Sequence, residues 1–234
     1  MPNGQAHLLV NLAEDEFRTY GARPEQVCRN SGAVVAGAHA KSVVIDTREQ
    51  RWLAAVEFLP GGASRFFSMP MTELSNQVVQ LQHLWRSDGM FLRERLLDAR
   101  APAAKFAIFE EVLLHHLRLK FDPAIQCAIT ALRGSASLEQ VLSLLGLSAR
   151  TLERRFSSQV GIPPKRFARV YRLQRVLRAV RRCAKPDWCW LAAEHGYADQ
   201  AHLIHDFRDL ADITPSAYKP HSPRRSNHVP IAAL

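Results

Sequence analysis

The pattern of apolar and polar residues changes along the chain, and the first 70 residues follow the short period of β-strands. In the segment 51–58, Trp52, Ala54 and Val56 alternate with other residues, as expected for a half-buried strand. Shorter apolar runs predict further strands at 7–12, 32–37 and 42–45. Gly and Pro residues, such as those at 60–62, separate these runs and favour a small sheet or an incomplete barrel.

From residue 71 onward, apolar positions recur every three or four residues, which predicts helices. We expect one helix from Thr72 through Trp85, a second one capped by Asp88, and a third one after Pro102. The apolar stripes of these helices suit either a core or a protein interface. A homodimer formed through this segment is therefore one hypothesis.

After residue 121, most helices carry a start signal, namely a side chain that can cap the helix N-terminus. These residues are Asp122, Ser137, Ser148 and Asp199. Pro164 begins a longer helix that is expected to run to about Arg182 and to span ~30 Å.

The same region contains one short pattern twice. Leu, three residues, Phe, five residues, Ile, one residue and Pro occur in this order, 51 residues apart, with a Gly upstream of each copy. The repeated residues are Gly146, Leu152, Phe156, Ile162 and Pro164, and then Gly196, Leu203, Phe207, Ile213 and Pro215. Gly161 ends the main helix of the first copy. We interpret these residues as the scaffold of a duplicated helix-turn-helix unit.

The net charge of +9 is confined to the second half of the chain. Residues 1–132 contain 14 Lys/Arg and 14 Asp/Glu, whereas residues 133–234 contain 17 and 8. Twelve basic residues and one acid, Glu153, lie between Arg150 and Lys185. This coincidence of charge with the repeat favours a polyanionic partner, above all double-stranded DNA.

Other features narrow the class of protein. The sequence has no apolar run that suits a membrane span and no signal peptide at its start, so we expect no membrane partner, a cytoplasmic location and reduced cysteines. No nucleophile motif, P-loop or dinucleotide fingerprint is present. We therefore assign no catalytic residue, cofactor or metal ligand, and predict that the protein is not an enzyme.

Two alternatives stay open at this point. One is a metal- or redox-responsive regulator that uses Cys183 and Cys189, although their spacing matches no zinc finger or ribbon. The other is a basic interaction module that binds polyanions without sequence specificity.

Two segments resemble the paired helix-turn-helix units of the AraC/XylS transcription regulators. The first reads LSARTLERRF at 147–156 and GIPP at 161–164, and the second reads AAEHGYADQAHL at 192–203 and ITP at 213–215. The resemblance covers roughly residues 122–220. It implies two recognition helices in successive major grooves, which lie about 34 Å apart, on either side of a linker helix. Family habit further implies activation, with RNA polymerase as an additional partner.

The resemblance also implies which residues contact DNA. Those expected to contact bases are Arg150, Glu153 and Arg154 in the first unit and Gln200, Ala201, Ile204 and His205 in the second. Those expected to contact phosphate are Thr151, Arg155, Lys165, Arg166, His202 and Arg208. Arg154 matches the usual base-contacting Arg and suits guanine, whereas Ile204 and His205 replace a polar residue and an Arg. Asp206 and Asp209 add negative charge, so we expect less base contact from the second unit.

Two departures from the family pattern concern packing. Leu142 stands where a small Ala is usual, and Asp212 stands where Gly is common. We expect a looser or shifted helix contact at the first of these positions.

Residues 1–70 resemble, more loosely, the reduced cupin-like sensor domain of a subgroup of the same family. The similar residues are FLPGGA at 58–63, Leu74 and LW at 84–85. This resemblance implies an unknown small-molecule effector, and no charged cluster in residues 1–120 indicates its chemical class. Such domains usually carry further strands upstream of residue 2, so we expect an incomplete barrel.

Together, these features predict an α+β protein that acts as a sequence-specific transcription regulator. The expected parts are a β-rich sensor-like domain at 1–70, a helical connector with a dimerisation option at 71–121, a double helix-turn-helix domain at 122–220 and a disordered tail at 221–234.

Overall fold

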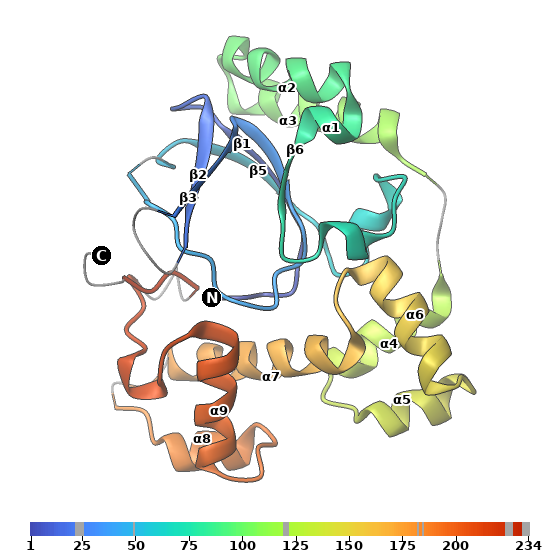
Figure 1. Ribbon diagram of the computed structural model, residues 1–234, viewed down its shortest axis with the longest axis vertical. Coiled ribbons are helices and arrows are strands. Elements are labelled where there is room, and N and C mark those ends of the chain that lie inside the picture. Colours follow the sequence, from blue (N-terminus) through green and yellow to red (C-terminus); the bar gives the residue numbers. More distant parts are fainter. Residues whose placement is uncertain are drawn as a thin grey trace.

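Figure 1 shows a computed structural model in which a curved β-sheet lies above a set of α-helices. The structure describes residues 1–21, 26–48, 50–118, 122–181, 183, 185–222 and 227–230. Strands occupy the first part of the chain, and α-helices follow from residue 81 onward. The predicted α+β class, with a β-rich first part and helix-turn-helix units at the end, is confirmed.

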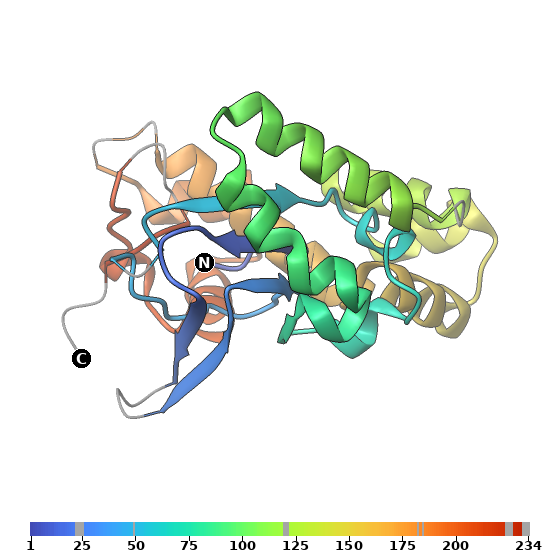
Figure 2. The same cartoon turned by 90° about the horizontal axis from the view of Figure 1, so that it is seen from above.

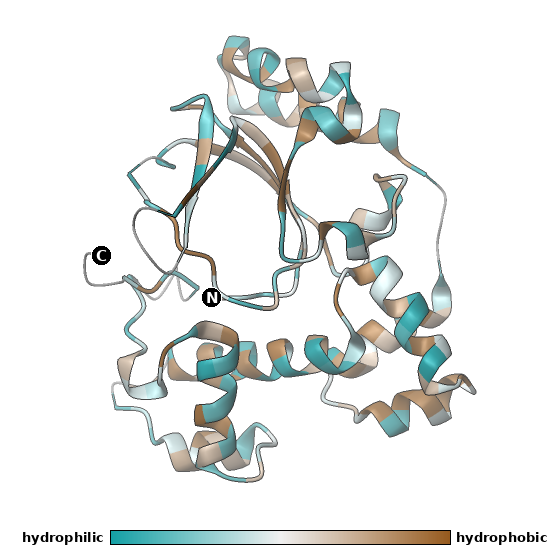
Figure 3. Ribbon diagram, in the orientation of Figure 1, coloured by the Kyte–Doolittle hydropathy of each residue, from teal (hydrophilic) through white to brown (hydrophobic). Residues whose placement is uncertain are grey.

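The larger sheet contains the apolar strands, which are largely brown in Figure 3. Its order is β5 (Leu53–Glu57), β1 (His7–Asn11), β4 (Ala33–Ala36) and β6 (Val78–Gln80), and neighbouring strands are antiparallel. Leu8 of β1 pairs with Val35 on one side and with Val56 on the other. The strands predicted at 7–12, 32–37 and 51–58 are therefore confirmed. The segment 42–45 contributes only an isolated bridge between Val44 and Tyr20.

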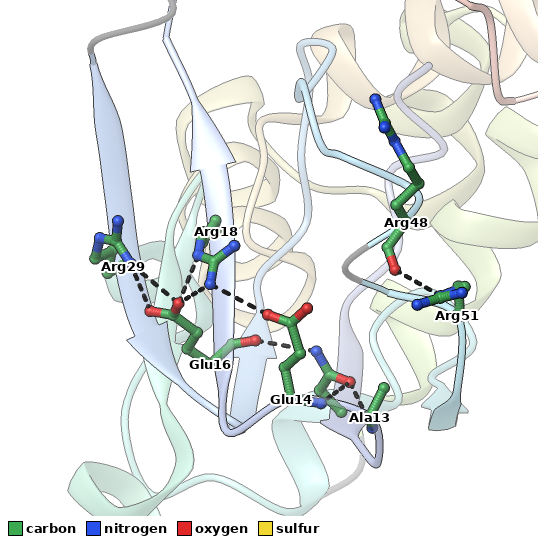
Figure 4. Close-up of polar contacts among 8 residues, drawn as sticks. Ala13, Glu14, Glu16, Arg18, Arg29, Arg48 and Arg51 are labelled. Carbon is green, nitrogen blue, oxygen red and sulfur yellow. Dashed lines mark hydrogen bonds and ion pairs between the residues drawn. The ribbon is translucent and has the colours of Figure 1, made fainter.

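A separate ribbon of β2 (Glu16–Tyr20) and β3 (Val27–Ser31) is polar and carries no apolar alternation that would predict it. Its register places Arg18 opposite Arg29. The carboxylate of Glu16 accepts hydrogen bonds from both guanidinium groups (Figure 4). The bond from Arg18, aided by that from Arg29, holds the pKa of Glu16 below its ordinary value. Glu16 thus offsets a like-charge pair that would otherwise weaken the ribbon.

The predicted helix from Thr72 through Trp85 is wrong over most of its length. The chain forms the 3-10 helix η2 (Met71–Leu74), then strand β6, and only then α1 (Leu81–Trp85). Val79 of β6 pairs with Val35 of β4, and cross-strand packing of β-branched residues outweighs the helical period here.

Two longer helices, α2 (Ser87–Asp98) and α3 (Pro102–His116), pack side by side next to the sheet (Figure 2). The helix break expected at Pro102 is confirmed, because α3 begins there. Asp88 does not cap α2 as predicted, since it lies inside the first turn, where its Oδ2 is 2.8 Å from Nε2 of His116. Buried residues of both helices, such as Leu92 and Phe109, share one core with the sheet.

The carboxy-terminal part is helical. Its elements are α4 (Pro123–Arg133), α5 (Leu138–Leu145), α6 (Ala149–Val160), α7 (Pro164–Val180), α8 (Trp188–Glu194), α9 (Gln200–Ala211) and the 3-10 helix η3 (Pro215–Ala217). The predicted caps Asp122, Ser137, Ser148 and Asp199 all accept hydrogen bonds from backbone amides of the helices that they precede. The predicted end of the long helix, Arg182, lies outside the described residues.

The 3-10 helices η1 (Ala63–Arg65) and η2 contact α6, and loops at the lower end of the sheet lie next to α7 and the end of α9 (Figure 1). Ala38 and Ala40, from the loop after β4, belong to the core of the helical part. The amide of Ser42 donates to the carbonyl of Leu210 at 2.9 Å. These contacts fix the position of the β-rich part relative to both helix-turn-helix units.

The tail at 221–234, for which the sequence predicts disorder, is described at 221–222 and 227–230. Asn227 lies beside the start of the chain, where its carbonyl accepts from the amino group of Met1 at 2.8 Å. The side chain of Asn227 also accepts from Gln174 of α7 at 2.9 Å. Residues 223–226 and 231–234 lie outside the described residues. Within the described part of the chain, no helix is long and apolar enough to cross a membrane.

Candidate nucleic-acid interface

The first helix-turn-helix unit consists of α5, the turn at Gly146 and α6. Gly146 adopts the left-handed conformation at the end of α5, with a φ of 61°, which Gly tolerates without strain. Leu152 and Phe156 are fully buried on the inner face of α6. Arg150, Glu153 and Arg154 are exposed on its other face. The structure therefore places the three predicted base-contacting residues of this unit on one accessible surface.

Arg155, which we expected to contact phosphate, forms an ion pair inside the domain. Its Nε and Nη2 donate to the carboxylate of Asp122, at 2.9 and 2.7 Å. Asp122 also caps α4. The pair therefore joins the start of α4 to the recognition helix α6, a structural role that the spacing in the sequence does not indicate.

The second unit consists of α8, the turn at Gly196 and α9. Leu203 and Phe207 are fully buried, in the same arrangement as Leu152 and Phe156. The predicted base-contacting residues Gln200, Ala201 and His205 are exposed, and Ile204 is partly buried. The accessible face of α9 thus carries fewer charged groups than that of α6.

The prediction that Asp206 adds negative charge to the DNA-facing side is wrong, because Asp206 is fully buried. Its Oδ1 accepts hydrogen bonds from Nε and Nη2 of Arg169 on α7, at 2.9 and 2.6 Å. In the sequence, Asp206 directly follows His205, which is exposed. No local pattern indicates that Asp206 has a partner inside the protein.

Asp209, one turn later, also points towards α7. Its carboxylate forms ion pairs with Arg166 at 2.5 Å and with Arg169 at 2.7 Å. Burial acts to raise the pKa of Asp209, but the hydrogen bonds from these two arginines outweigh it and leave the pKa below its ordinary value. Arg166, a predicted phosphate contact, is therefore engaged in holding α9 against α7.

The linker helix α7 carries the buried stripe that the sequence predicts. Phe167, Val170, Leu173, Leu177 and Val180 all face the core. The 17 residues of α7 correspond to about 25 Å, slightly less than predicted. Arg172 lies over the ring of Tyr197, 5.1 Å from its centroid, so this basic residue also contacts the second unit.

The remaining residues predicted to contact phosphate differ in their exposure and in the contacts that they already make. Lys165 and Arg208 are exposed. The amide of Thr151 donates to the capping Ser148. The ring of His202 packs edge-on against Tyr197, with centroids 5.1 Å apart. Lys165 and Arg208 are therefore the most accessible cations of this set.

The two departures from the family pattern are accommodated locally. Asp212 adopts the left-handed conformation at the end of α9, with a φ of 57°, and its carboxylate accepts from the hydroxyl of Ser42 at 3.1 Å. Asp is among the residues that tolerate this conformation. Leu142 lies at the edge of the core, where it is only partly buried.

Family comparisons place these elements among known domains. Residues 141–221 match a family described as a helix-turn-helix domain, and residues 1–80 match one described as a domain of unknown function. No curated protein matches the sequence.

Solved structures of ToxT from Vibrio cholerae have a similar outline at low sequence identity. An apo variant is 10% identical, with a TM-score of 0.47, over 92% of this chain and 88% of that chain. A second ToxT structure gives a TM-score of 0.46 at the same identity and coverage. A fatty acid-bound ToxT structure gives 0.44 at 9% identity, over 92% of this chain and 86% of that chain.

The class of the protein follows from the matched domain and its exposed helices: it is a DNA-binding transcription regulator. The helix-turn-helix domain at residues 141–221 is of the AraC type, which confirms the resemblance to the AraC/XylS regulators over this part of the chain.

Proposed function

We propose that the protein binds a specific DNA site through two successive major grooves, with α6 in the first and α9 in the second. The observation that carries this proposal is that two capped helices with exposed faces both pack against the linker helix α7. A linker of about 25 Å suits units that enter grooves about 34 Å apart on one face of DNA.

Base contact is assigned mainly to the first unit. Arg154 is exposed and long enough to bond guanine with two donors, with Arg150 and Glu153 beside it. In the second unit, Gln200 and His205 supply polar contacts, while Ala201 and Ile204 suit the methyl group of thymine.

Phosphate contact is assigned first to Lys165 and Arg208, with Thr151 and His202 in support. Arg155 and Arg166 remain in this proposal as secondary contacts, because each already pairs with a carboxylate. Such contacts fix the position of a protein on DNA without selecting its sequence.

The β-rich part and the connector are proposed as a regulatory unit, with boundaries at residues 70, 121 and 220. Five large apolar side chains of α2 and α3 are exposed: Met90, Phe91, Leu97, Phe106 and Leu114. Their number on two neighbouring helices supports the proposal of a homodimer. A small-molecule effector, contact with RNA polymerase, activation of transcription and a cytoplasmic location complete the proposal, in which the protein is not an enzyme.

A competition binding assay tests the proposal. Purified protein is bound to labelled DNA from upstream of its own coding region and challenged with unlabelled copies of that DNA or of a scrambled sequence. Sequence-specific binding predicts that the scrambled DNA competes at least about a thousandfold less well. Equal competition by both would favour the alternative of a non-specific basic module.

The alternative of a regulator that senses metal or redox state through Cys183 and Cys189 has little structural support. Both thiols are exposed. Neither belongs to a group of potential metal ligands among the residues that the structure describes.

A further inference from the structure

A cluster of metal-binding side chains lies away from the DNA-binding helices, where α2 and α3 meet. Asp88 comes from the first turn of α2, and His115 and His116 are the last two residues of α3. One potential ligand atom from each residue lies within 4.8 Å of the others. We propose that these three residues form a binding site for a divalent transition metal ion, with Zn²⁺ as the best-suited ion.

The chemistry of the three ligands favours this class of ion. Two imidazoles and one carboxylate are the protein ligands of many three-ligand zinc sites, in which a fourth position is open to water or another ligand. Only one of the three potential ligands is a carboxylate, which disfavours Ca²⁺ and Mg²⁺ because these ions depend on several carboxylate or carbonyl oxygens. Imidazole ligands instead select zinc, nickel and copper.

One ligand is already held in place. The ring of His116 stacks on Trp85 with centroids 4.3 Å apart and an interplanar angle of 6°. Trp85 in turn donates its indole N–H to the carbonyl of Phe66 at 3.1 Å.

The other two ligands need only small movements. Oδ2 of Asp88 lies 2.8 Å from Nε2 of His116 and 3.8 Å from Nε2 of His115. Zn–N and Zn–O bonds of about 2.1 Å in a tetrahedral site place ligand atoms roughly 3.4 Å apart. The side chain of His115 is 73% exposed, so it is free to rotate into this arrangement.

The position of the site gives the ion a means to act on the rest of the chain. An ion bound here joins the start of α2 to the end of α3. Two residues after His116, the amide of Arg118 donates to the carbonyl of Arg65 at 2.7 Å. Asp122, which caps α4 and pairs with Arg155 of α6, follows a few residues later. Metal binding would therefore stabilise the end of α3, from which the chain continues to Asp122 and α4.

Cobalt provides the direct test, because four-coordinate Co²⁺ absorbs visible light far more strongly than the hydrated ion. Titration of the full-length protein with Co²⁺ is expected to give this absorption with one ion per chain, and Zn²⁺ is expected to displace it. The fluorescence of Trp85 should fall in the same titration, because a paramagnetic ion then lies beside its stacking partner. Replacement of Trp85 by Phe should remove that change and leave the absorption.

Substitutions assign the ligands. His115→Ala and Asp88→Asn should each weaken Co²⁺ binding by more than about tenfold, since even the loss of an outer-shell partner costs 10–100-fold. His83→Ala is the matched control, because this exposed histidine of α1 lies outside the cluster. His115 is exposed, so its removal should leave the urea unfolding curve unchanged.

Two results would overturn the proposal. One is the absence of tetrahedral Co²⁺ absorption with wild-type protein at ~100 μM metal. The other is equal Co²⁺ affinity in the wild type, His115→Ala and Asp88→Asn. Either result would leave the Asp88–His116 contact as an ordinary link between two helices. The test requires no DNA, so it is independent of the proposed transcriptional role.

Discussion

The two helix-turn-helix units share the same arrangement of buried apolar residues. They differ in the ion pairs that join each recognition helix to a neighbouring helix, because these pairs have opposite polarity. In the first unit, the recognition helix supplies the cation, Arg155, and α4 supplies the carboxylate of Asp122. In the second unit, the recognition helix supplies the carboxylates of Asp206 and Asp209, and α7 supplies Arg166 and Arg169.

This difference changes the interpretation of charge on the interface. The acids of α9 do not repel DNA from its exposed face, because they neutralise cations of the linker helix. The basic surface of α7 is correspondingly smaller than the sequence indicates. Our proposal that the second unit contributes weaker base contacts therefore depends on Ile204, which is partly buried, and on exposed His205, rather than on neighbouring acids.

The largest expected effects test the similarity of the two units. Phe156→Ala and Phe207→Ala each remove a fully buried ring and should each lower the free energy of unfolding by about 3–5 kcal/mol. Urea unfolding followed by circular dichroism measures this change. Trp52, whose ring is in a residue that is 72% exposed, is the matched control, and its replacement by Ala should cost less than about 0.5 kcal/mol. A large cost for only one of the two buried rings would contradict the shared scaffold.

The next effect tests the difference in attachment. Asp206→Ala leaves Arg169 without its buried partner and should cost about 2–4 kcal/mol, at the lower end for buried pairs because Arg169 keeps partial access to water. Asp122→Ala should cost less, about 1–2 kcal/mol, since it removes a cap and a more exposed pair. Glu194→Ala, at an exposed position of α8, should change little. The reverse order for the two aspartates would show that the first unit depends more on its ion pair.

The sequence predicted the shared apolar scaffold of the two units but not the ion pairs that distinguish them. The capped helix starts after residue 121, the turn glycines and the buried Leu and Phe positions were predictable because each depends on residues close in sequence. The pairing of Arg169 with Asp206 joins residues 37 positions apart, and no local pattern indicates it. Strand β6 was missed for a similar reason, because its conformation depends on pairing with distant β4.

DNA binding is expected to show a smaller but selective difference. Arg154→Ala should weaken specific binding by roughly 1–3 kcal/mol and leave non-specific binding nearly unchanged. His205→Ala should weaken specific binding by less than about threefold, because His lacks the two parallel donors with which Arg binds guanine. Competition assays at fixed salt measure both. Lys165→Ala is the control, and should weaken binding to specific and scrambled DNA alike. An equal loss on both DNAs for Arg154→Ala would assign Arg154 to phosphate.

The smallest expected effects concern the residues that end the two recognition helices, Gly161 and Asp212, which lie 51 positions apart as the repeat requires. Both are left-handed, with φ of 98° and 57°. A Cβ at Gly161 would lie 3.1 Å from the carbonyl oxygen of Met71. Gly161→Ala should therefore cost about 1–2 kcal/mol of unfolding free energy through backbone strain, with the close contact adding to it.

At the second of these positions, Asp212→Ala should lower the free energy of unfolding by about 1 kcal/mol, and Asp212→Gly by less than about 0.5 kcal/mol. Both variants lose the exposed hydrogen bond to Ser42, but Gly also removes the backbone strain. Urea midpoints of the three variants should therefore rank Asp212→Gly above Asp212→Ala, and Asp212→Ala above Gly161→Ala. If Gly161→Ala lowers the urea midpoint least of the three, the neighbouring carbonyl of Met71 imposes no steric restriction at Gly161. The close approach of η2 to α6 would then contribute nothing to the difference between the two units.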